Sequence, residues 1–484
     1  MIRMEGISAR YPEDDAAILS DFSLRIAPGE CVLLTGPSGC GKTTVTRLAN
    51  GLLKEFYGCE LQGKFTLAGR DAFKLGLNDF SRLAGSVFQA PRSQFFTLQV
   101  AAEIAFPAEN AALPEGEIRK RVLAASGLAG VRHILNQDLS RLSSGQKQAV
   151  AVASAAVLFP KALILDEPSA NLDPLATRNL HDLLVKLKAQ GASILIVEHK
   201  HYWLRDLCDR AIIGDNGKVK QELSGREYFG LSTEASLALV LRHTRPQMPE
   251  AAGRPAPVEQ TGVPVSGLSF GYAKKDLLLS DIELLLPKNS LTGLIGENGA
   301  GKSTLARLLM GLEKTAKGII EFGGQRLLPK DRLKKSFYVM QDADYQLVTE
   351  SVISEIPIGQ TQADAMPKAL KILAPLGLSG LEERHPSTLS GGQKQRLTLA
   401  LAVMSDAELI IFDEPTSGLD GRNMRKVTAM LRELAASGKV VLVISHDGEF
   451  LTEACDRLLQ LKNGKVTEIE LCKNNHALLQ NTLW

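Results

Sequence analysis

A duplicated stretch limits most strongly what this chain can fold into. Residues 142–173 read LSSGQKQAVAVASAAVLFPKALILDEPSANLD, and residues 389–420 read LSGGQKQRLTLALAVMSDAELIIFDEPTSGLD. The copies are aligned without a gap at an offset of 389 − 142 = 247, so we expect one local geometry in both. In each, a short apolar strand follows a helix and ends in an acidic pair, a pattern that suits a metal–phosphate site with a water to activate.

Length, charge and cysteine pattern narrow the class further. With 484 residues the chain is long enough for two domains with separate cores, and the repeat predicts two. The 56 basic and 54 acidic residues give a net charge of 56 − 54 = +2, which does not favour a nucleic-acid binder. Six scattered cysteines without a CxxC pair favour reduced thiols over a zinc or iron–sulfur site.

The hydropathy pattern predicts no membrane span. The first fifteen residues, MIRMEGISARYPEDD, lack the apolar segment of a signal peptide. The longest apolar run, residues 149–159, is well short of the roughly 20 residues that a spanning helix needs. We therefore expect the chain to stay out of the bilayer, while a membrane protein could still be its partner.

Two glycine-rich loops predict phosphate binding. Each follows a short apolar strand, Cys31 to Thr35 or Leu291 to Ile295, and precedes a helix, Val45 to Leu53 or one that ends at Met310. In this context the pattern G-x-x-x-x-G-K-[ST] wraps a phosphate in backbone N–H groups at a helix N-terminus. The predicted ATP-binding residues here are Gly36, Pro37, Ser38, Gly39, Cys40, Gly41, Lys42, Thr43 and Thr44, with Gly296, Glu297, Asn298, Gly299, Ala300, Gly301, Lys302, Ser303 and Thr304. The lysines should reach the β- and γ-phosphates, and Thr43 and Ser303 should hold Mg²⁺.

A second matched block surrounds two glutamines. Gln89 and Gln341 each end an apolar strand, a second glutamine follows five residues later, and a glutamate follows fourteen residues later, at Glu103 and Glu355. A glutamine in this place can ligate Mg²⁺ and respond to the γ-phosphate. We predict that role for Gln89 and Gln341, although a single copy would fit an ordinary polar strand end.

Histidines and tyrosines recur at matched distances from these motifs. His199 and His446 each follow an apolar strand, Ser193–Val197 or Val440–Ile444, 33 residues after Asp166 or Asp413. We predict that both histidines contact the γ-phosphate. Tyr11 and Tyr272 precede the loop lysines by 31 and 30 residues and could stack on adenine.

The sequence also suggests where the domains end. We expect a first ATPase domain over residues 1–228, a Pro/Ala-rich linker over 229–262, a second ATPase domain over 263–475 and a short polar tail over 476–484. A short helix is expected near residues 232–241, inside the linker.

The P-loop, glutamine, LS[SG]GQ, DE, SxxLD and histidine motifs, present twice, resemble the ABC-type ATPase family over nearly the whole chain. The resemblance implies an α/β fold with two tandem P-loop NTPase domains, each a RecA-like core with an antiparallel β subdomain and a helical signature subdomain. The glutamine block resembles more narrowly the ATPases of energy-coupling factor (ECF) transporters, which import vitamins, cobalt or nickel.

Family geometry implies ATP and Mg²⁺ as cofactors and an intramolecular pseudo-dimer of the two domains, in which each ATP lies between one P-loop and the other domain's signature. It implies Glu167, His199, Glu414 and His446 as catalytic residues, Thr43, Gln89, Asp166, Ser303, Gln341 and Asp413 as metal ligands, and Ser143, Gly145, Gln146, Ser390, Gly392 and Gln393 as signature contacts. Ser144 stands where the second copy has Gly391, which predicts a modest asymmetry between the sites.

The resemblance also implies partners: a transmembrane coupling subunit and a substrate-binding membrane subunit at the cytoplasmic face of the cell membrane, without nucleic acid. Glu103 and Glu355 could pair there with arginines of the coupling subunit, or they could be solvated residues at the start of a helix. Two alternatives stay open. One is a fused ATPase of a monosaccharide importer, against which the glutamine block argues. The other is a soluble duplicated ATPase acting on ribosomes, a class that usually has a long charged linker.

Overall fold

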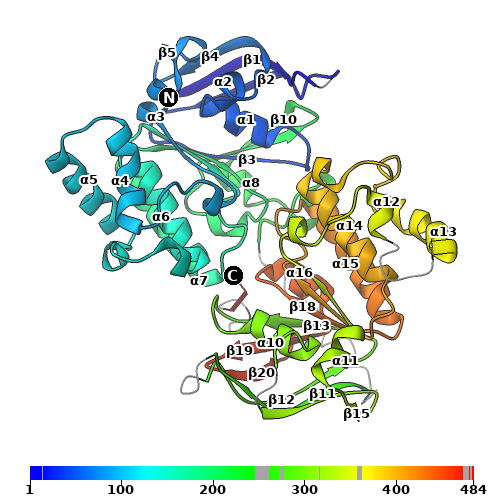
Figure 1. Cartoon of the computed structure of the whole chain (residues 1–484). Coiled ribbons are helices and arrows are strands. Elements are labelled where there is room, and N and C mark those ends of the chain that lie inside the picture. Colours follow the sequence, from blue (N-terminus) through cyan, green and yellow to red (C-terminus); the bar gives the residue numbers. More distant parts are fainter. Residues whose placement is uncertain are drawn as a thin grey trace. The chain divides into compact units, whose positions relative to one another are not determined.

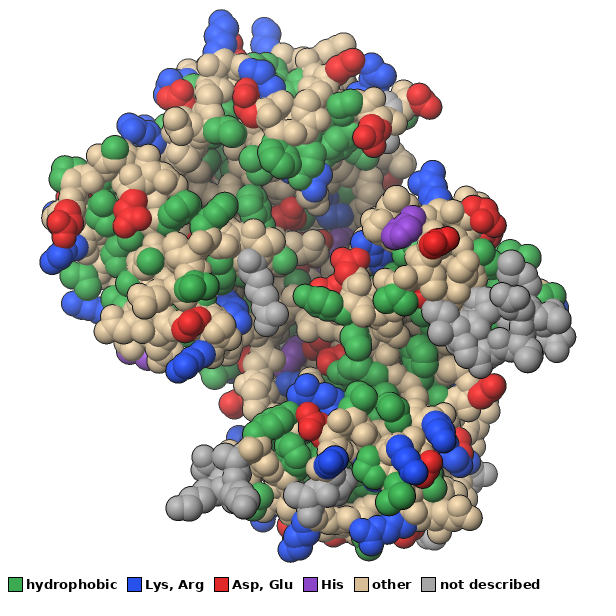
Figure 2. Space-filling model, viewed as in Figure 1, with side chains coloured by type: hydrophobic (Ala, Val, Ile, Leu, Met, Phe, Trp, Pro, Cys, Tyr) green, Lys and Arg blue, Asp and Glu red, His purple; other side chains and the backbone are tan. Residues whose placement is uncertain are grey.

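The computed structural model describes residues 1–13, 15–245, 261–272, 277–314, 317–356, 362–471, 479 and 482–483, with the side chains of Arg92, residues 362–366 and Lys368 left out. The chain divides near residue 246 into two compact units (Figure 1). Figure 2 shows that basic and acidic side chains are interspersed over the visible face of both units. No helix in the described ranges is long and apolar enough to cross a membrane.

The first unit is built on a mainly parallel sheet with strand order β10-β9-β3-β8-β7-β6. The strands are β3 (Cys31–Thr35), β6 (Ala84–Val87), β7 (Ala162–Asp166), β8 (Ser193–Val197), β9 (Arg210–Asp215) and β10 (Lys218–Ser224), of which only β10 is antiparallel to its neighbour. Every residue of β3, β7 and β8 is buried, as expected for strands covered on both faces. Alternate residues of β3 enter two different cores, Val32 and Leu34 on one face and Cys31 and Leu33 on the other.

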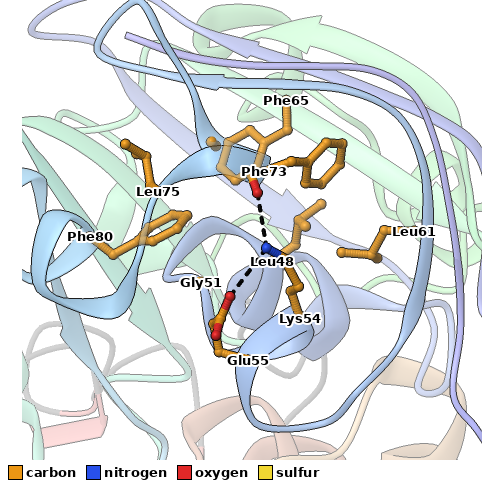
Figure 3. Close-up of a pocket in the computed structure, with 10 residues that line it drawn as sticks. Leu48, Gly51, Lys54, Glu55, Leu61, Phe65, Phe73, Leu75 and Phe80 are labelled. Atoms are coloured by element: carbon orange, nitrogen blue, oxygen red, sulfur yellow. Dashed lines mark hydrogen bonds and ion pairs between the residues drawn. The ribbon is translucent and has the colours of Figure 1, made fainter.

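An antiparallel sheet covers one face of this core. Its order is β2-β1-β4-β5, from β1 (Ile2–Arg10), β2 (Leu19–Ile26), β4 (Glu60–Leu67) and β5 (Arg70–Asp71). Helices α1 (Lys42–Ala49), α2 (Leu52–Glu55) and α3 (Leu77–Leu83) pack in the same apolar cluster. Figure 3 shows a small pocket between α1, α2 and this sheet, which is lined by the core residues Leu48, Phe65 and Phe80 and, at its edge, by the ion pair of Lys54 and Glu55.

The remaining helices of the first unit form two groups. Helices α4 (Val100–Asn110), α5 (Glu115–Leu128) and α6 (Ser144–Ala156) share one apolar cluster, which makes the helical subdomain. Helices α7 (Pro174–Ala189) and α8 (Gly225–Tyr228) pack around the other face of the main sheet, and the short helix α9 (Thr233–Ala238) follows α8 in the chain. The short helix expected near 232–241 is therefore confirmed as α9, and Leu241 is buried in the core of this unit.

The second unit repeats this architecture. Its main sheet has the order β16-β17-β18-β13-β19-β20, and its antiparallel sheet has the order β12-β11-β14-β15. The strands are β11 (Gly262–Phe270), β12 (Leu279–Pro287), β13 (Ser290–Ile295), β14 (Lys317–Phe322), β15 (Gln325–Arg326), β16 (Ser336–Val339), β17 (Leu409–Asp413), β18 (Val440–Ile444), β19 (Arg457–Lys462) and β20 (Lys465–Ile469). The helices are α10 (Lys302–Met310), α11 (Pro329–Lys334), α12 (Val352–Glu355), α13 (Gln362–Leu373), α14 (Gly391–Met404), α15 (Gly421–Ala436) and α16 (Gly448–Ala454). The expected α/β fold with two tandem domains is confirmed.

The expected helix over Val45–Leu53 was wrong in one respect, because the structure ends α1 at Ala49 and begins α2 at Leu52. Gly51 causes the break with a φ of 83°, and a Cβ on it would lie 2.5 Å from Phe80 Cδ2. The central part of the predicted linker, residues 246–260, and most of the tail lie outside the described residues.

Candidate functional site

The P-loops have the geometry that the sequence predicts. In the first unit Gly36, Gly39 and Gly41 all have positive φ, between 83° and 142°. Lys42 starts α1 and folds back across the loop, where its Nζ donates to the carbonyl oxygens of Gly36 (3.0 Å) and Pro37 (2.9 Å). Backbone amides at such a turn and the start of a helix favour an anion.

The acidic pair of the first unit lies at the carboxyl end of β7. Asp166 accepts a hydrogen bond from Thr46 Oγ1 on α1 (3.0 Å), which places its carboxylate beside the P-loop helix. Burial raises the pKa of Asp166, and the hydroxyls of Thr46 and Thr43 and the charge of Lys42 oppose that rise. The structure thus brings Thr43, predicted to hold Mg²⁺, close to the predicted Mg²⁺ anchor.

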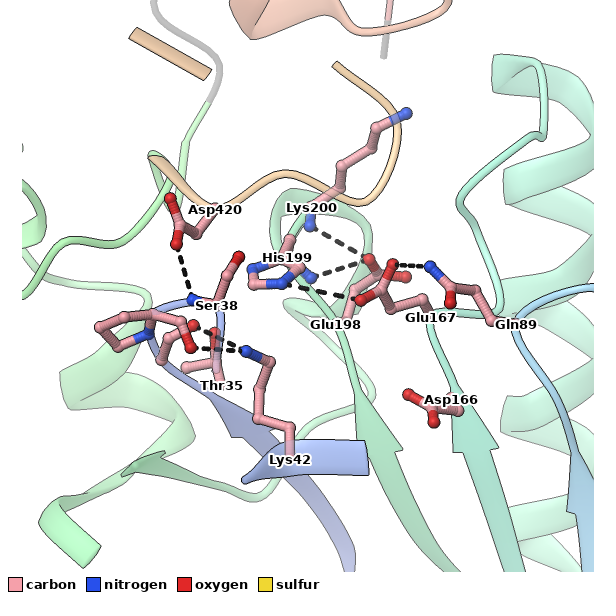
Figure 4. A network of polar contacts seen from close by, with 12 residues as sticks. Thr35, Ser38, Lys42, Gln89, Asp166, Glu167, Glu198, His199, Lys200 and Asp420 are labelled. Carbon is pink, nitrogen blue, oxygen red and sulfur yellow. Dashed lines mark hydrogen bonds and ion pairs between the residues drawn. The ribbon is translucent and has the colours of Figure 1, made fainter. Parts of the chain in front are cut away.

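Glu167 lies among the other predicted site residues. Its Oε2 accepts a hydrogen bond from Gln89 Nε2 (2.7 Å), and its Oε1 lies 3.7 Å from His199 Nε2 (Figure 4). Glu167 has a φ of 45°, an uncommon conformation for a side chain of this size. Burial, followed by the charges of Glu198 and Asp166, raises the pKa of Glu167 to about 8. A carboxylate so placed has the proton affinity of a general base.

The second unit builds the same site with different supports. Asp413 Oδ2 accepts hydrogen bonds from Ser303 Oγ (3.3 Å) and from the hydroxyl of Tyr338 (2.5 Å). His446 Nε2 lies 3.9 Å from Glu414 Oε1 and 3.0 Å from Oδ1 of Asn298 in the P-loop. Glu414 has a φ of 50°, which matches that of Glu167.

The serines of the two signatures begin long helices. Ser143 and Ser390 are the N-caps of α6 and α14, and each forms a capping box with the glutamine three residues later, Gln146 or Gln393. Each serine oxygen accepts from the glutamine N–H, so its own proton remains available for a further acceptor. A Cβ at Gly391 would meet nothing within 4 Å, so a side chain such as that of Ser144 in the first copy would also fit at this position of the second copy.

Tyr11 and Tyr272 lie over the P-loop helices. Their hydroxyls lie 3.4 Å and 3.2 Å from Oγ1 of Thr44 and Thr304, and Arg47 and Arg307 donate to them, each at 3.0 Å. Tyr272 is 62% exposed. Adenine stacking remains a prediction for both rings.

The prediction that Glu103 and Glu355 pair with arginines of a partner subunit was wrong. Glu103 and Glu355 are each 2% exposed and therefore do not offer their carboxylates to a partner. Glu103 accepts from the backbone N–H groups of Phe96 and Thr97 (3.0 and 2.9 Å), and Glu355 accepts from those of Val348 and Thr349 (2.6 and 2.7 Å). The helix-start glutamate thus locks the loop before it.

The second glutamine of each block has a structural role in the same loops. Gln94 accepts from Phe88 N (3.1 Å) and donates to Ser86 O (2.9 Å), which ties the loop to β6. Gln346 makes the same pair of bonds with Met340 N and Tyr338 O, both at 3.1 Å. The repeated spacing between the two glutamines therefore has a cause in the geometry of the loop.

The predicted metal ligands fit Mg²⁺. In each unit they offer a hydroxyl, a carboxylate and an amide oxygen, the hard oxygen donors that Mg²⁺ prefers. Asp166 and Asp413 are largely buried, and the lysine of the P-loop adds a positive charge beside each of them. Such a site has the right chemistry for a magnesium-bound triphosphate.

Sequence reasoning missed several polar supports of the site. They are Thr46, Ser169 and Glu198 in the first unit, and Tyr338, Thr416 and Asp447 in the second. Because Glu198 aligns with Ser445 and not with an acidic residue, the repeat did not reveal its role. The same alignment pairs Lys200 with Asp447, and this pairing would have shown that the acidic residue lies two positions later in the second copy.

Comparison with known proteins identifies the family. The sequence profile described as "ABC transporter" matches residues 19–170 and 279–417, so the chain belongs to this family. A Treponema denticola protein named "Putative ABC transporter ATP-binding protein" is 38% identical over 99% of this chain and 99% of its own length. The Bacillus subtilis (strain 168) "Putative HMP/thiamine import ATP-binding protein YkoD" is 33% identical over 95% of this chain and 90% of its own length.

Solved structures agree on the fold. An archaeal ribosome recycling factor, aABCE1, superposes with a TM-score of 0.65 at 23% identity over 98% of this chain and 92% of that one. Ribosome-bound archaeal ABCE1 gives a TM-score of 0.71 at 22% identity over 98% and 80%. Family membership and the two complete sets of motifs make this chain an ABC-type ATPase with two ATPase domains.

Proposed function

We propose that this chain is the ATP-hydrolysing subunit of a membrane importer of the ECF type, which takes up a vitamin or a transition metal. The observation that carries the proposal is a loop that both units build in the same way. In each unit a buried glutamate, Glu103 or Glu355, accepts a hydrogen bond from the backbone of a loop residue whose large apolar side chain faces solvent. These loop residues are Phe96, which is 75% exposed, and Val348, which is 77% exposed.

These two side chains hold matching places, since 348 − 96 = 252 is also the separation of the glutamines, 341 − 89. Phe96 stacks on Phe106 of α4 at 5.1 Å, and Leu98 beside it is 78% exposed. Exposed apolar side chains held in an ordered loop suit a partner protein. The partner we propose is an apolar coupling helix of a transmembrane subunit, beside a substrate-binding membrane subunit at the cytoplasmic face of the membrane.

The ATP sites in this proposal form between the two domains. One site combines Lys42, Thr43, Gln89, Asp166, Glu167 and His199 with Ser390, Gly392 and Gln393 of the other domain, and the second combines Lys302, Ser303, Gln341, Asp413, Glu414 and His446 with Ser143, Gly145 and Gln146. The serine hydroxyl and the amides at the start of α6 or α14 would bind the γ-phosphate of the ATP held by the other domain. Closure around ATP and release after hydrolysis would drive transport.

We assign the following roles to the residues of each site. Glu167 and Glu414 orient and deprotonate the attacking water, and His199 and His446 hold the γ-phosphate. Lys42 and Lys302 neutralise phosphate charge. Bound Mg²⁺, held by Thr43, Asp166 and Gln89 or by Ser303, Asp413 and Gln341, would polarise the phosphoryl oxygens.

The relatives support transport over other uses of the fold. The Bacillus subtilis relative is named for HMP/thiamine import, whereas the similarity to the ribosome-recycling structures, at 22–23% identity, shows the fold alone. The net charge of +2 does not favour a ribosomal RNA surface. A monosaccharide importer would use the same reaction with a different membrane partner.

The docking loops give the test. We expect Phe96→Asp combined with Val348→Asp to abolish co-purification with membrane subunits while ATP binding persists. Leu328→Asp is the matched control, because Leu328 is 62% exposed on a different part of the second unit. Retained assembly of the double variant, or co-sedimentation with ribosomes in place of membrane subunits, would count against the proposal.

A further inference from the structure

We infer that Glu198 and Asp447 are positioning residues of the two hydrolytic sites, and that the two domains place this carboxylate at different positions of the same loop. Each carboxylate joins the loop after the catalytic glutamate to the loop that carries the histidine. The inference rests on the roles proposed for Glu167, His199, Glu414 and His446.

In the first unit Glu198 directly follows β8 and is 1% exposed. Its Oε2 accepts from Ser169 Oγ (2.7 Å) and Ser169 N (3.3 Å), and its Oε1 accepts from the backbone N–H groups of His199 (2.8 Å) and Lys200 (3.2 Å). Figure 4 shows Glu198 beside Glu167 at the ends of β8 and β7. Four hydrogen bonds from two loops make this carboxylate a direct tie between them.

In the second unit the same tie comes from a residue two positions later. Asp447 Oδ2 accepts from Thr416 Oγ1 (2.8 Å), and Asp447 Oδ1 accepts from Phe450 N (3.2 Å) as the N-cap of α16. Asp447 is 3% exposed and Thr416 is fully buried. The offset of 247 aligns Ser169 with Thr416 (416 − 169), Glu198 with Ser445 (445 − 198) and Lys200 with Asp447 (447 − 200).

Because the carboxylate lies at a different position in each unit, the catalytic glutamates Glu167 and Glu414 have different hydrogen-bond donors. Ser445 Oγ donates to Glu414 Oε2 (3.0 Å) and accepts from Asp447 N (3.1 Å). In the first unit that position holds a carboxylate, and the Oε2 of Glu167 is instead bound by Gln89 (2.7 Å). The carboxylate therefore comes from residue 198 in the first unit, and from residue 447, the counterpart of residue 200, in the second unit.

The tie matters because the loop that it holds begins at a strained residue. Glu167 and Glu414 have φ of 45° and 50°, and such a conformation persists only where the surroundings over-determine it. Without the tie, we expect the glutamate and the histidine to lose their fixed places relative to the attacking water. Such misplacement lowers the rate of the chemical step more than it lowers nucleotide affinity.

The test replaces residues 198 and 200 in the full chain by the residues found at the matching positions, 445 and 447, of the second unit. Glu198→Ser should lower kcat for ATP hydrolysis at the first site by about 10-fold or more, toward the level of Glu167→Gln, with little change in KM. Adding Lys200→Asp rebuilds the arrangement of the second unit, and we expect Glu198→Ser/Lys200→Asp to recover most of the lost kcat. A defect in packing alone would not be repaired by a new carboxylate at position 200.

Two measurements complete the design. Ser169→Ala removes one hydrogen bond without disturbing a charge, and it should lower kcat several-fold even if Glu198→Ser folds poorly. Full turnover in both Glu198→Ser and Ser169→Ala, or a double exchange no better than Glu198→Ser, would overturn the inference. If Glu167→Gln also kept full turnover, the proposed site itself would be wrong. If Glu167→Gln were inactive while Glu198→Ser stayed fully active, only the role inferred for Glu198 would be rejected.

Discussion

Gln89 and Glu167 are in direct contact, with the Nε2 of Gln89 2.7 Å from the Oε2 of Glu167. Gln89 follows β6, and Glu167 follows β7, so the bond joins neighbouring strands of the main sheet. Gln89 begins the same loop that presents Phe96 to solvent. A movement of that loop therefore changes the surroundings of the glutamate that we propose as the general base.

The first prediction concerns Glu167 and Glu414 as separate bases. Glu167→Gln or Glu414→Gln alone should lower ATP turnover, because the amide cannot take a proton from water, by about 100-fold or more at the altered site. Steady-state phosphate release measures the effect, and binding of a fluorescent ATP analogue with Mg²⁺ should remain. If either variant keeps full turnover, that glutamate does not serve a working site.

A second prediction concerns Gly145 in the first signature helix. A Cβ at Gly145 would lie 2.6 Å from the Cβ of Ala176 on α7, and neither atom can rotate away. Gly145→Ala should therefore lower the free energy of unfolding by about 1–2 kcal/mol, even after the gain in helix propensity. Fluorescence of Trp203, with Trp484→Phe to remove the second tryptophan, would report on the first unit.

The matched control is Gly392→Ala in the second signature. There the nearest atom to an added Cβ is Nη1 of Arg396 at 3.5 Å, an ordinary contact with a flexible side chain. Thermal melting should show a stability equal to or slightly above that of the parent chain. Equal losses at both glycines would show that helix packing against Ala176 is not the cause.

A third prediction concerns the pH dependence of stability in the first unit. His201 is 1% exposed and is hydrogen-bonded to Thr35 (2.9 Å) and Tyr228 (3.0 Å). Burial lowers the pKa of His201 to about 3 from the usual 6.5. Its neutral form is therefore favoured by folding, and stability falls as the pH drops below 6.5, because only the unfolded chain takes up the proton.

The expected loss is about 2 kcal/mol between pH 7 and pH 5 from this residue alone. Urea denaturation followed by Trp203 fluorescence at both pH values would measure it, again with Trp484→Phe. His201→Gln should be less stable at pH 7 but should lose about 2 kcal/mol less over the same interval. An unchanged slope in that variant would contradict the predicted protonation of the unfolded state.

The sequence predicted the fold well where the local pattern of apolar residues alone determines the bounds of an element. Strands β3, β8 and β18 have the bounds expected from their apolar runs, because a strand buried on both faces is nearly continuously apolar. The helix after the first P-loop was predicted too long, since the clash of Gly51 with Phe80 depends on tertiary packing. No local pattern shows which ring will lie against a glycine.

The candidate site was predictable in its motifs but not in its supports. The duplicated spacing pointed to Glu167, Gln89 and His199, and the structure places all three together. The hydrogen bonds of Glu198 and Tyr338 were not foreseen, because each is present in one copy only. Glu103 was expected to pair with an arginine of a partner or to be solvated at a helix start, whereas it is buried and binds backbone amides of the preceding loop.

The last prediction follows from that buried carboxylate. Glu103→Ala would leave the N–H groups of Phe96 and Thr97 and the hydroxyl of Thr97 without their acceptor. Each buried group left unsatisfied costs about 1–3 kcal/mol, so the loop should loosen before the rest of the unit unfolds. Hydrogen exchange followed by mass spectrometry should show faster exchange in the peptide that spans residues 94–99.

The variant Glu103→Gln separates the effect of the negative charge of Glu103 from the effect of its position as a hydrogen-bond acceptor. Glutamine keeps one oxygen acceptor in the same place, so we expect exchange in this loop to lie between the parent and Glu103→Ala. Membrane-subunit binding should follow the same order, because a loosened loop presents Phe96 in many positions and must be ordered again on docking. Faster exchange without weaker docking would show that the ordered loop is not what the partner binds.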